Sequence, residues 1–371
     1  MVRSVGVEEE LLLVDAVSGE PRALATAVLA AAARERSEGE EVFEAELHRQ
    51  QVEFATSPCT AMGELAEEIR HCRGEAARHA EKLGATVVAL GTSPLSVSPS
   101  LGFGERHRWL EEHFGLTTQE QLTCGCHVHV AVDSDEEGVA VLDRIRPWLA
   151  VLLALSANSP FWQGEDSGYS SYRSRVWGRW PSAGPVEPFG TADRYHAQVA
   201  DMIGTGTLLD EGMVYFDARL SAAYPTVEIR IADVPLDSAT TVLIATLARG
   251  LVETAARAWK AGQPPSQHRV ELLRLASWRA ARSGLEDRLL HPATMRPAPA
   301  ETVLRALFDH VRDALDDHGD LLRAQETLAT VLRTGSGARA QRDLLARSDG
   351  DLAAMVAACA RRTCPDPNAG T

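Results

Sequence analysis

The order of apolar and polar residues along the chain predicts strands and helices that alternate over most of its length. Period-two alternation or short apolar runs predict strands at 5–14, 51–56, 86–90, 122–132, 215–220 and 226–232. Apolar residues three and four positions apart predict helices at 23–36, 61–83, 139–156, 190–206 and 238–262. Beyond residue 265 we expect only helices and linkers.

Segments without a regular pattern join these elements. An acidic loop follows the first helix as far as Glu41, and the stretch 95–114 is expected to be a loop. The segment 158–185 combines tryptophans and arginines with many Gly and Ser residues. Long loops are usually functional or disordered, and this aromatic and basic content favours an ordered loop that lines or covers a substrate site.

The distribution of the elements predicts an α+β fold. The strands lie in roughly the first two-thirds of the chain, which favours a mostly antiparallel sheet covered by helices. We expect its concave face to be the active-site surface. Residues 1–262 are predicted to form the catalytic domain, 263–363 a helical C-terminal extension packed on it, and 364–371 a disordered tail.

Composition narrows the class of protein. The net charge of −15 argues against a nucleic-acid partner, because such binders concentrate positive charge. No run approaches the roughly 18 apolar residues of a membrane span, and no signal-peptide pattern precedes the first strand, so a cytoplasmic protein is expected. The six cysteines are expected to be free thiols. Cys124-Gly-Cys126 could bind a soft metal, but small residues leading into a buried strand explain it better.

Three predicted strands each carry two reactive polar residues two positions apart. The pairs are Glu8 and Glu10, His127 and His129, and Glu228 and Arg230. Residues i and i+2 of a strand point to one face, so adjacent strands would gather carboxylates, imidazoles and a guanidinium on one surface. Each pair also has a plain structural reading: an exposed sheet face, a hydrogen-bonded core pair and a simple ion pair, respectively.

The candidate ligands suit hard divalent cations. Glu46 and Glu53 add two carboxylates, although Glu46 alone is weak evidence. Oxygen-rich sites with one or two imidazoles favour Mg²⁺ or Mn²⁺ over tetrahedral Zn²⁺. Neither a Walker A motif nor a Gly-x-Gly-x-x-Gly turn is present, so arginines and metals would have to hold any nucleotide phosphates. The available arginines are Arg173, Arg175, Arg179 and Arg230.

The motifs and their order resemble the type 2 glutamate–cysteine ligases, also called carboxylate–amine ligases, of the glutamine-synthetase-like superfamily. The resemblance covers most of residues 5–260. It runs through Gly6-Val-Glu-Glu-Glu10, Glu46 to Thr56, Gly91-Thr-x-Pro94, Gly125-Cys-His-Val-His129, Leu155-Ser-Ala-Asn-Ser-Pro160, Tyr169-Ser-Ser-Tyr-Arg-Ser-Arg175 and Thr226-Val-Glu-Ile-Arg-Ile-Ala-Asp233. A catalytic domain like those of glutamine synthetase and the guanidino kinases is implied, as are ATP, two or more Mg²⁺ or Mn²⁺ ions, and a dimer or larger homo-oligomer.

The resemblance also implies a role for each matched residue. Glu10, Glu46 and Glu53 would surround one metal near the acceptor carboxylate, with Glu53 also catalytic. A second metal that bridges the ATP phosphates would be held by Glu8, His127 and Glu228. Arg173 and Arg230 would stabilise the transferring phosphoryl group and the acyl phosphate, and Arg230, Arg175 and Arg179 would contact the nucleotide. Substrate contacts would come from His129, Arg173 and Trp177.

The implied reaction is ATP-dependent formation of an amide through an acyl phosphate, with glutamate and cysteine as the first substrates to test. The motifs describe activation of the acid, so neither the acid nor the amine is identified by them. Two other readings stay open at this point. The same carboxylates and histidines could serve a metal-dependent hydrolase, or the fold could persist in a binding protein without chemistry.

Overall fold

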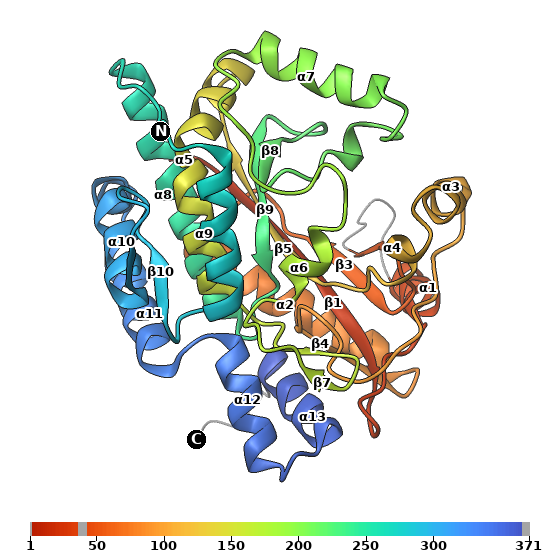
Figure 1. The fold of residues 1–371 in the computed structure, drawn as a ribbon. Helices are drawn as coiled ribbons and strands as arrows, with labels where there is room; N and C mark the ends of the chain where they lie inside the picture. Colours follow the sequence, from red (N-terminus) through yellow and green to blue (C-terminus); the bar gives the residue numbers. More distant parts are fainter. Residues whose placement is uncertain (1, 36–42, 366–371) are drawn as a thin grey trace.

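The computed structural model describes residues 2–35 and 43–365 and is built on one antiparallel sheet. The strands follow the order β2-β3-β1-β5-β9-β8, and β4 pairs with the second half of β1 (Figure 1). Their bounds are β1 Val5–Asp15, β2 Phe43–Ala45, β3 Gln51–Ala55, β4 Ala85–Val88, β5 Gly125–Ala131, β8 Ala218–Leu220 and β9 Thr226–Asp233. The predicted α+β class and antiparallel sheet are confirmed.

Long helices cover one face of this sheet. They are α2 (Met62–Glu81), α5 (Asp135–Ser156) and α8 (Ser238–Lys260), and α5 packs on both α8 and β9. Helix α5 begins at Asp135 because Ser134 caps it by accepting a hydrogen bond from the Glu137 amide. The sheet face turned away from these helices is left for polar side chains.

The C-terminal part adds further helices to the same core. Helix α9 (Val270–Ser283) packs on α5, and α10 (Ala300–Asp317) packs on α8. Helices α11 (Leu321–Thr334), α12 (Gly337–Arg347) and α13 (Leu352–Thr363) follow, and α12 and α13 lie together at the bottom of Figure 1. The division into a catalytic domain and an extension at residue 262 stays a prediction.

Short elements occupy the connections. The remaining helices are α1 (Ala25–Glu35), α3 (Glu105–Phe114), α4 (Leu116–Gln119), α6 (Arg173–Trp177), α7 (Ala192–Gly204) and the 3₁₀ turn η1 (Glu211–Met213). Two small hairpins pair β6 (Phe161–Trp162) with β7 (Glu165–Asp166), and β10 (Arg288–Leu290) with β11 (Pro297–Pro299). The segment 158–185 is therefore ordered, but it contains a hairpin and the helix α6.

Two sequence-based expectations about these connections are wrong, and a third is wrong at one end. The end of the expected loop 95–114 is helix α3, which buries only Leu110 fully and so leaves almost no apolar periodicity to detect. The β10–β11 hairpin lies in the region expected to hold only helices, and its short strands bury Leu289 alone fully. The strand expected at 215–220 begins only at Ala218. The acidic loop to Glu41 and most of the expected tail lie outside the described residues.

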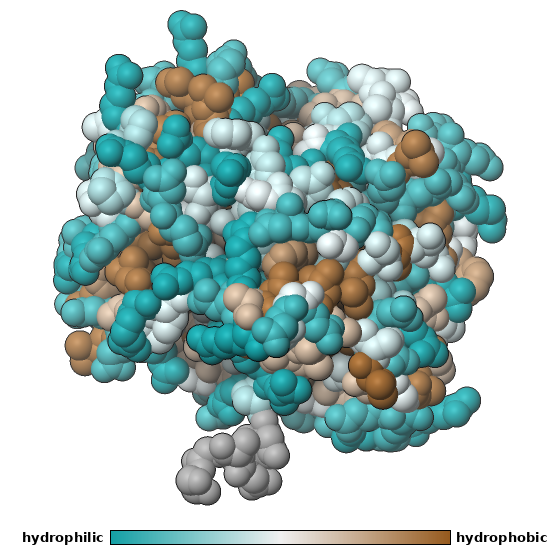
Figure 2. Space-filling model, turned by 60° about the horizontal axis from the view of Figure 1, so that its bottom comes forward, coloured by the Kyte–Doolittle hydropathy of each residue, from teal (hydrophilic) through white to brown (hydrophobic). Residues whose placement is uncertain are grey.

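Helix α8 is long and apolar enough to cross a membrane by length and composition alone. Within the structure, however, 78% of its apolar window is buried, as expected for the core helix of a globular domain. The face in Figure 2 carries hydrophilic residues interrupted by separate hydrophobic groups. Within the described residues none of the six cysteines forms a disulfide, and Cys124 and Cys126 are buried.

Candidate active site

A row of acidic and imidazole side chains crosses four adjacent strands on the open face of the sheet. Glu53 on β3 lies opposite Glu10 on β1, and Glu8 on β1 lies opposite His127 on β5. The next pair across is His129 on β5 and Glu228 on β9. These positions share a face because each strand alternates and the registers align them. The three i, i+2 pairs therefore converge as predicted.

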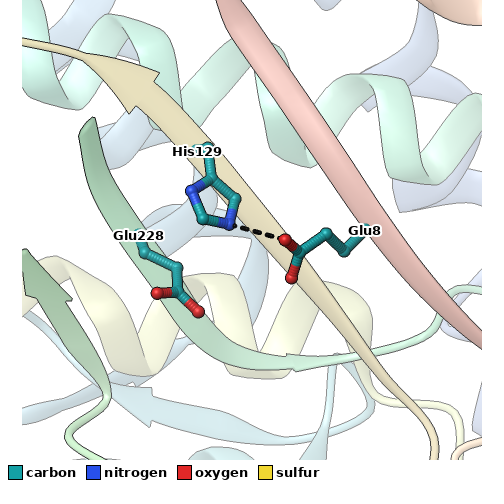
Figure 3. A group of neighbouring side chains, drawn as sticks. All are labelled: Glu8, His129 and Glu228. Atoms are coloured by element: carbon teal, nitrogen blue, oxygen red, sulfur yellow. Dashed lines mark ion pairs between the residues drawn. The ribbon is translucent and has the colours of Figure 1, made fainter. Parts of the chain in front are cut away.

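Ligand atoms in this row form three overlapping groups, each within 4.8 Å, that could hold a metal ion. They comprise Glu8, His129 and Glu228; Glu8, Glu53 and His127; and Glu10, Glu46 and Glu53. Figure 3 shows His129 on β5 between Glu8 and Glu228, which reach toward it from the strands on either side. Glu8 and Glu53 each belong to two groups, so adjacent groups share a carboxylate.

Contacts between the imidazoles and Glu8 hold the middle of the row together. His127 Nδ1 lies 3.0 Å from Glu8 Oε2, and His129 Nε2 lies 3.1 Å from Glu8 Oε1. The other His127 nitrogen, Nε2, is buried, has no hydrogen-bond partner among the described residues and lies 3.8 Å from Glu10 Oε1. A buried imidazole nitrogen without a partner, directed at carboxylates, fits a cation ligand.

Burial and mutual repulsion set the protonation of the acidic groups. Burial raises the pKa of Glu10 to about 8, and the nearby charge of Glu46 adds to this effect. The pKa of Glu53 is also raised well above its usual value, by burial and then by Glu46, Glu10 and Glu8. Crowded carboxylates of this kind need a cation to ionise together, because like charges at short range disfavour ionisation.

At the opposite end of the row, neighbouring groups favour the ionised form of the carboxylates. Burial would raise the pKa of Glu8, but hydrogen bonds from His127 and His129 outweigh it and lower the pKa. Burial and then Arg230 lower the pKa of His127 to about 4, so this imidazole is neutral at neutral pH. Burial opposes the ionisation of Glu228, yet Arg230 and Arg219 lower its pKa to about 2.

Two arginines border the row from different elements. Arg230 forms an ion pair with Glu228 on the same strand, and its buried Nε has no partner in the described part of the chain. Arg173, at the start of α6, is almost fully buried, and the same holds for its Nε and Nη2. Both guanidiniums lie over the Trp177 ring, at 5.4 Å for Arg173 and 5.8 Å for Arg230. Buried cations with unused donors are suited to binding an anion.

The end of β9 anchors the segment that carries Arg173. The carboxylate of Asp233 accepts hydrogen bonds from the hydroxyls of Ser159 and Ser171, at 2.7 and 2.8 Å. Ser159 Oγ in turn accepts a hydrogen bond of 2.9 Å from the Arg173 amide. Because these contacts are buried, they fix the start of α6 against the sheet.

Two cavities adjoin Trp177. The acid cavity, defined by Glu10, Glu46, Gln51, Arg106, His107 and Tyr215 among its lining residues, has a volume of about 280 Å³. A second cavity of about 460 Å³, the α6 cavity, lies between α6, the end of β9 and α9. Trp177, Trp180 and Arg230 line both cavities and so separate them.

The residues expected to bind metal all lie in the row: Glu8, Glu10, Glu46, Glu53, His127 and Glu228. His129, expected as a substrate contact, lies in the same row. Arg173, Arg230 and Trp177 border it. By contrast, Arg175 and Arg179 line the α6 cavity on the exposed side of α6, and Arg179 pairs with Glu120 at 2.6 Å.

Sequence reasoning missed two residues of the site. Arg219 on β8 donates a hydrogen bond of 2.7 Å to Glu228, and the alternation of Asp217 and Arg219 before Thr226 could have indicated it. Gly125 lets the Arg173 guanidinium approach β5, since a Cβ at this position would overlap it. No local signal reveals that approach.

The family of the chain follows from its sequence. The model of the glutamate–cysteine ligase family 2 matches residues 4–358. The chain belongs to this family. A Streptomyces avermitilis protein with the provisional name glutamate–cysteine ligase 2-1 is 64% identical over 98% of this chain and 99% of its own length. A Paenarthrobacter aurescens protein with the same provisional name is 48% identical over 93% of this chain and 91% of its own.

Solved structures share the fold. The glutamate–cysteine ligase of Francisella tularensis, solved in complex with AMP, superposes with a TM-score of 0.67 at 12% identity over 99% of this chain and 90% of that one. A bifunctional glutathione synthetase from Pasteurella multocida gives a TM-score of 0.68 at 15% identity, over 97% of this chain. This chain covers 52% of that longer protein. The fold expected from the motifs is therefore confirmed, and the family is one of ligases.

Proposed function

We propose that the protein is an ATP-dependent carboxylate–amine ligase that forms an amide through an acyl phosphate, with glutamate and cysteine as the first substrate pair. The observation that carries the proposal is the row of three overlapping groups, bordered by two buried arginines with unused donors. Such a row matches the needs of phosphoryl transfer, in which positioning and charge neutralisation do most of the work.

The donor set favours Mg²⁺ or Mn²⁺ at these groups. Each group offers at least two carboxylates, which hard cations prefer, and none of the three contains a cysteine. The raised pKa values of Glu10 and Glu53 fit groups that a cation ionises. When bound, such ions would neutralise phosphate charge and orient the donor and acceptor oxygens. Glu10, Glu46 and Glu53 would serve the acid end, and Glu8, His127, His129 and Glu228 the nucleotide end.

The chain's own cations would complete the phosphate site. Arg230 and Arg173 each have a partly unused guanidinium that can donate to the transferring phosphoryl group or the acyl phosphate. Trp177, whose ring lies beneath both guanidiniums, would help to hold them in place and to keep water away from the reactive carbonyl. Arg175 and Arg179 lie on the exposed side of α6, away from the row. Their contacts with the nucleotide therefore stay a prediction.

The order of the groups along the row suggests which end binds the acid and which end binds ATP. The acid cavity contains Glu10 and Glu46, so the acid substrate would bind at the β3 side of the row. ATP would then approach from the β9 side, where Glu228 is held ionised by Arg219 and Arg230. Glu8 and Glu53, shared between groups, lie where the phosphoryl group would cross.

Turnover with defined substrates tests the proposal. Purified protein with Mg-ATP, glutamate and cysteine should release ADP in one-to-one ratio with amide, and a panel of acids and amines extends the search. Glu53→Ala and His127→Ala should each abolish turnover, whereas Glu67→Ala, an exposed position on α2, should not. Mg-ATP binding without turnover on any pair would contradict ligase activity, and tightly held Zn²⁺ would favour a hydrolase.

Two accompanying predictions concern the cell and the assembly. We expect a cytoplasmic protein without a nucleic-acid or membrane partner, and a homodimer or larger homo-oligomer. Fractionation of cells and sedimentation of the purified protein test these two predictions separately from the chemistry.

A further inference from the structure

The charges that line the α6 cavity are unusual because they include one carboxylate among five arginines. Within its described lining the acid is Asp217 and the arginines are Arg173, Arg175, Arg179, Arg230 and Arg274. The Asp217 carboxylate has no hydrogen bond or ion pair with any described residue, and neither do the guanidiniums of Arg173, Arg175 and the exposed Arg274. One carboxylate beside guanidiniums that lack a counter-charge suits a ligand that carries both an ammonium and a carboxylate group.

Asp217 is placed beside the reaction site by the sheet. It precedes β8 and lies opposite Arg230 on β9, whose amide donates a hydrogen bond of 2.9 Å to the Asp217 carbonyl. Cross-strand neighbours share a face, so Asp217 lies on the same face as Arg230 and the carboxylate row. Arg173 and Arg274 both act electrostatically on its carboxylate.

We propose that the α6 cavity binds the amine substrate as an α-amino acid, with its ammonium group at Asp217 and its carboxylate at Arg274. This inference rests on the proposed ligase function. Leu153, Phe216, Trp180 and Ile231 supply apolar wall for a compact side chain. The amine would reach the acyl phosphate past Trp177 and Arg230, which line both this cavity and the acid cavity.

The chemistry of amide formation requires a proton acceptor at this place. An amine attacks only as the free base, so the ammonium must first give one proton to the Asp217 carboxylate. The nitrogen lone pair then forms the C–N bond, the bond from the carbonyl carbon to the phosphate oxygen breaks, and phosphate leaves with its electron pair. The second nitrogen proton passes to the departing phosphate. Burial raises the pKa of Asp217 to about 7, which suits proton exchange near neutral pH.

Hydroxylamine separates the amine step from acid activation. Its nitrogen is uncharged at neutral pH, so it traps an acyl phosphate without help from a base. Asp217→Asn should lower kcat with cysteine about 100-fold, as expected for loss of a general base, and leave hydroxamate formation within about threefold of wild type. Asp201→Asn, an exposed position on α7, is the matched control and should change neither rate. If wild type and Asp217→Asn had the same kcat with cysteine, the role of Asp217 would be refuted but the ligase function would not.

A carboxylate-free amine tests the other half of the site. Arg274→Ala should raise the KM for cysteine about tenfold and leave the KM for cysteamine, which lacks the carboxylate, unchanged. Arg279→Ala on the same helix is the control, because Arg279 does not line the cavity. An increase in the KM for ATP instead would assign the cavity to the nucleotide and overturn the proposal. Failure of the wild type to form any hydroxamate would overturn the ligase function itself.

Discussion

The guanidinium of Arg173 lies against Gly125, in space that any side chain at position 125 would fill. The same glycine donates its amide to Glu10 Oε2 at 2.7 Å. One residue on β5 therefore positions both a carboxylate of the row and a cation beside it. The absence of a side chain at this position is a requirement of the site, because the clash would be with the working end of Arg173.

Gly125→Ala should disable the enzyme without unfolding it. The added methyl group displaces Arg173, and a misplacement of about 1 Å at a reacting centre can cost roughly 100-fold in rate. We expect a similar loss for Arg173→Ala, and little further loss when the two changes are combined, since both remove one interaction. Steady-state kinetics of the three variants measure this. Gly74→Ala on α2, where an added methyl meets nothing, is the control. Additive losses would contradict the coupling.

Glu53→Gln should abolish activity and raise the stability of the metal-free protein. Its carboxyl is buried among Glu46, Glu10 and Glu8, which raise its pKa, so the metal-free fold opposes its ionisation and a neutral amide avoids that cost. We expect the free energy of unfolding without Mg²⁺ to rise by about 1 kcal/mol and turnover to be lost. Denaturant unfolding in EDTA measures the first effect. A destabilised Glu53→Gln protein would show that the carboxylates do not repel one another.

Binding of Mg²⁺ should release protons. With a pKa of about 8, Glu10 is mostly protonated at neutral pH, the pKa of Glu53 is raised in the same direction, and a cation competes with the protons of these groups. For each proton released, affinity should rise about tenfold per pH unit until Glu10 ionises near pH 8. Calorimetry in buffers of different ionisation enthalpy counts the protons. Affinity that does not vary below pH 8 would contradict the assigned protonation.

The same groups set a pH dependence of stability. The pKa of Glu10 rises from 4.5 in a model compound to about 8 in the fold, so the folded state binds more protons. Its contribution is therefore complete below pH 4.5 and is lost as pH rises through about 8. The melting temperature of the metal-free protein should fall across this window, and saturating Mg²⁺ should restore it. Thermal scans with EDTA or MgCl₂ compare the two conditions.

Adjacent residues of β1 should give opposite phenotypes. Glu9 faces the helices and accepts hydrogen bonds from Arg73 at 2.7 and 2.8 Å, whereas Glu8 faces the row. Glu9→Gln leaves Arg73 buried without its counter-charge, which should cost about 3 kcal/mol of stability. Glu8→Gln should weaken Mg²⁺ binding with a smaller change in stability. Denaturant unfolding and metal titration of both variants separate these effects, and identical profiles would contradict the assignment of faces.

The sequence predicted the acidic row because alternation in a strand is a local property. A spacing of two positions, as from Glu8 to Glu10 or from His127 to His129, is enough to place both side chains on one face. Local patterns also marked the boundaries of α5 and α8 closely. The order β3-β1-β5-β9, which brings the pairs together, depends on contacts far apart in the chain and was not predicted.

Features that depend on distant contacts escaped prediction. The approach of Arg173 to Gly125 joins residues on two separate elements, and the pairing of Arg219 with Glu228 depends on the register of β8. Helix α3 was missed because its surface is almost entirely polar, so tertiary contacts rather than periodicity hold it. The split into two cavities could not be inferred, since it is a property of packing around Trp177.

Arg73 also donates to the carbonyls of Pro235 and Leu236, just after β9. It thus joins α2 to β1, through Glu9, and to the exit of β9. A slip of β1 by one residue would turn Glu8 and Glu10 toward the helices and break this bond. The Arg73 guanidinium, on the far side of the sheet, therefore helps to hold the register that keeps the reactive surface facing outward. A substitution of Arg73 would abolish activity although every residue on the open face is unchanged.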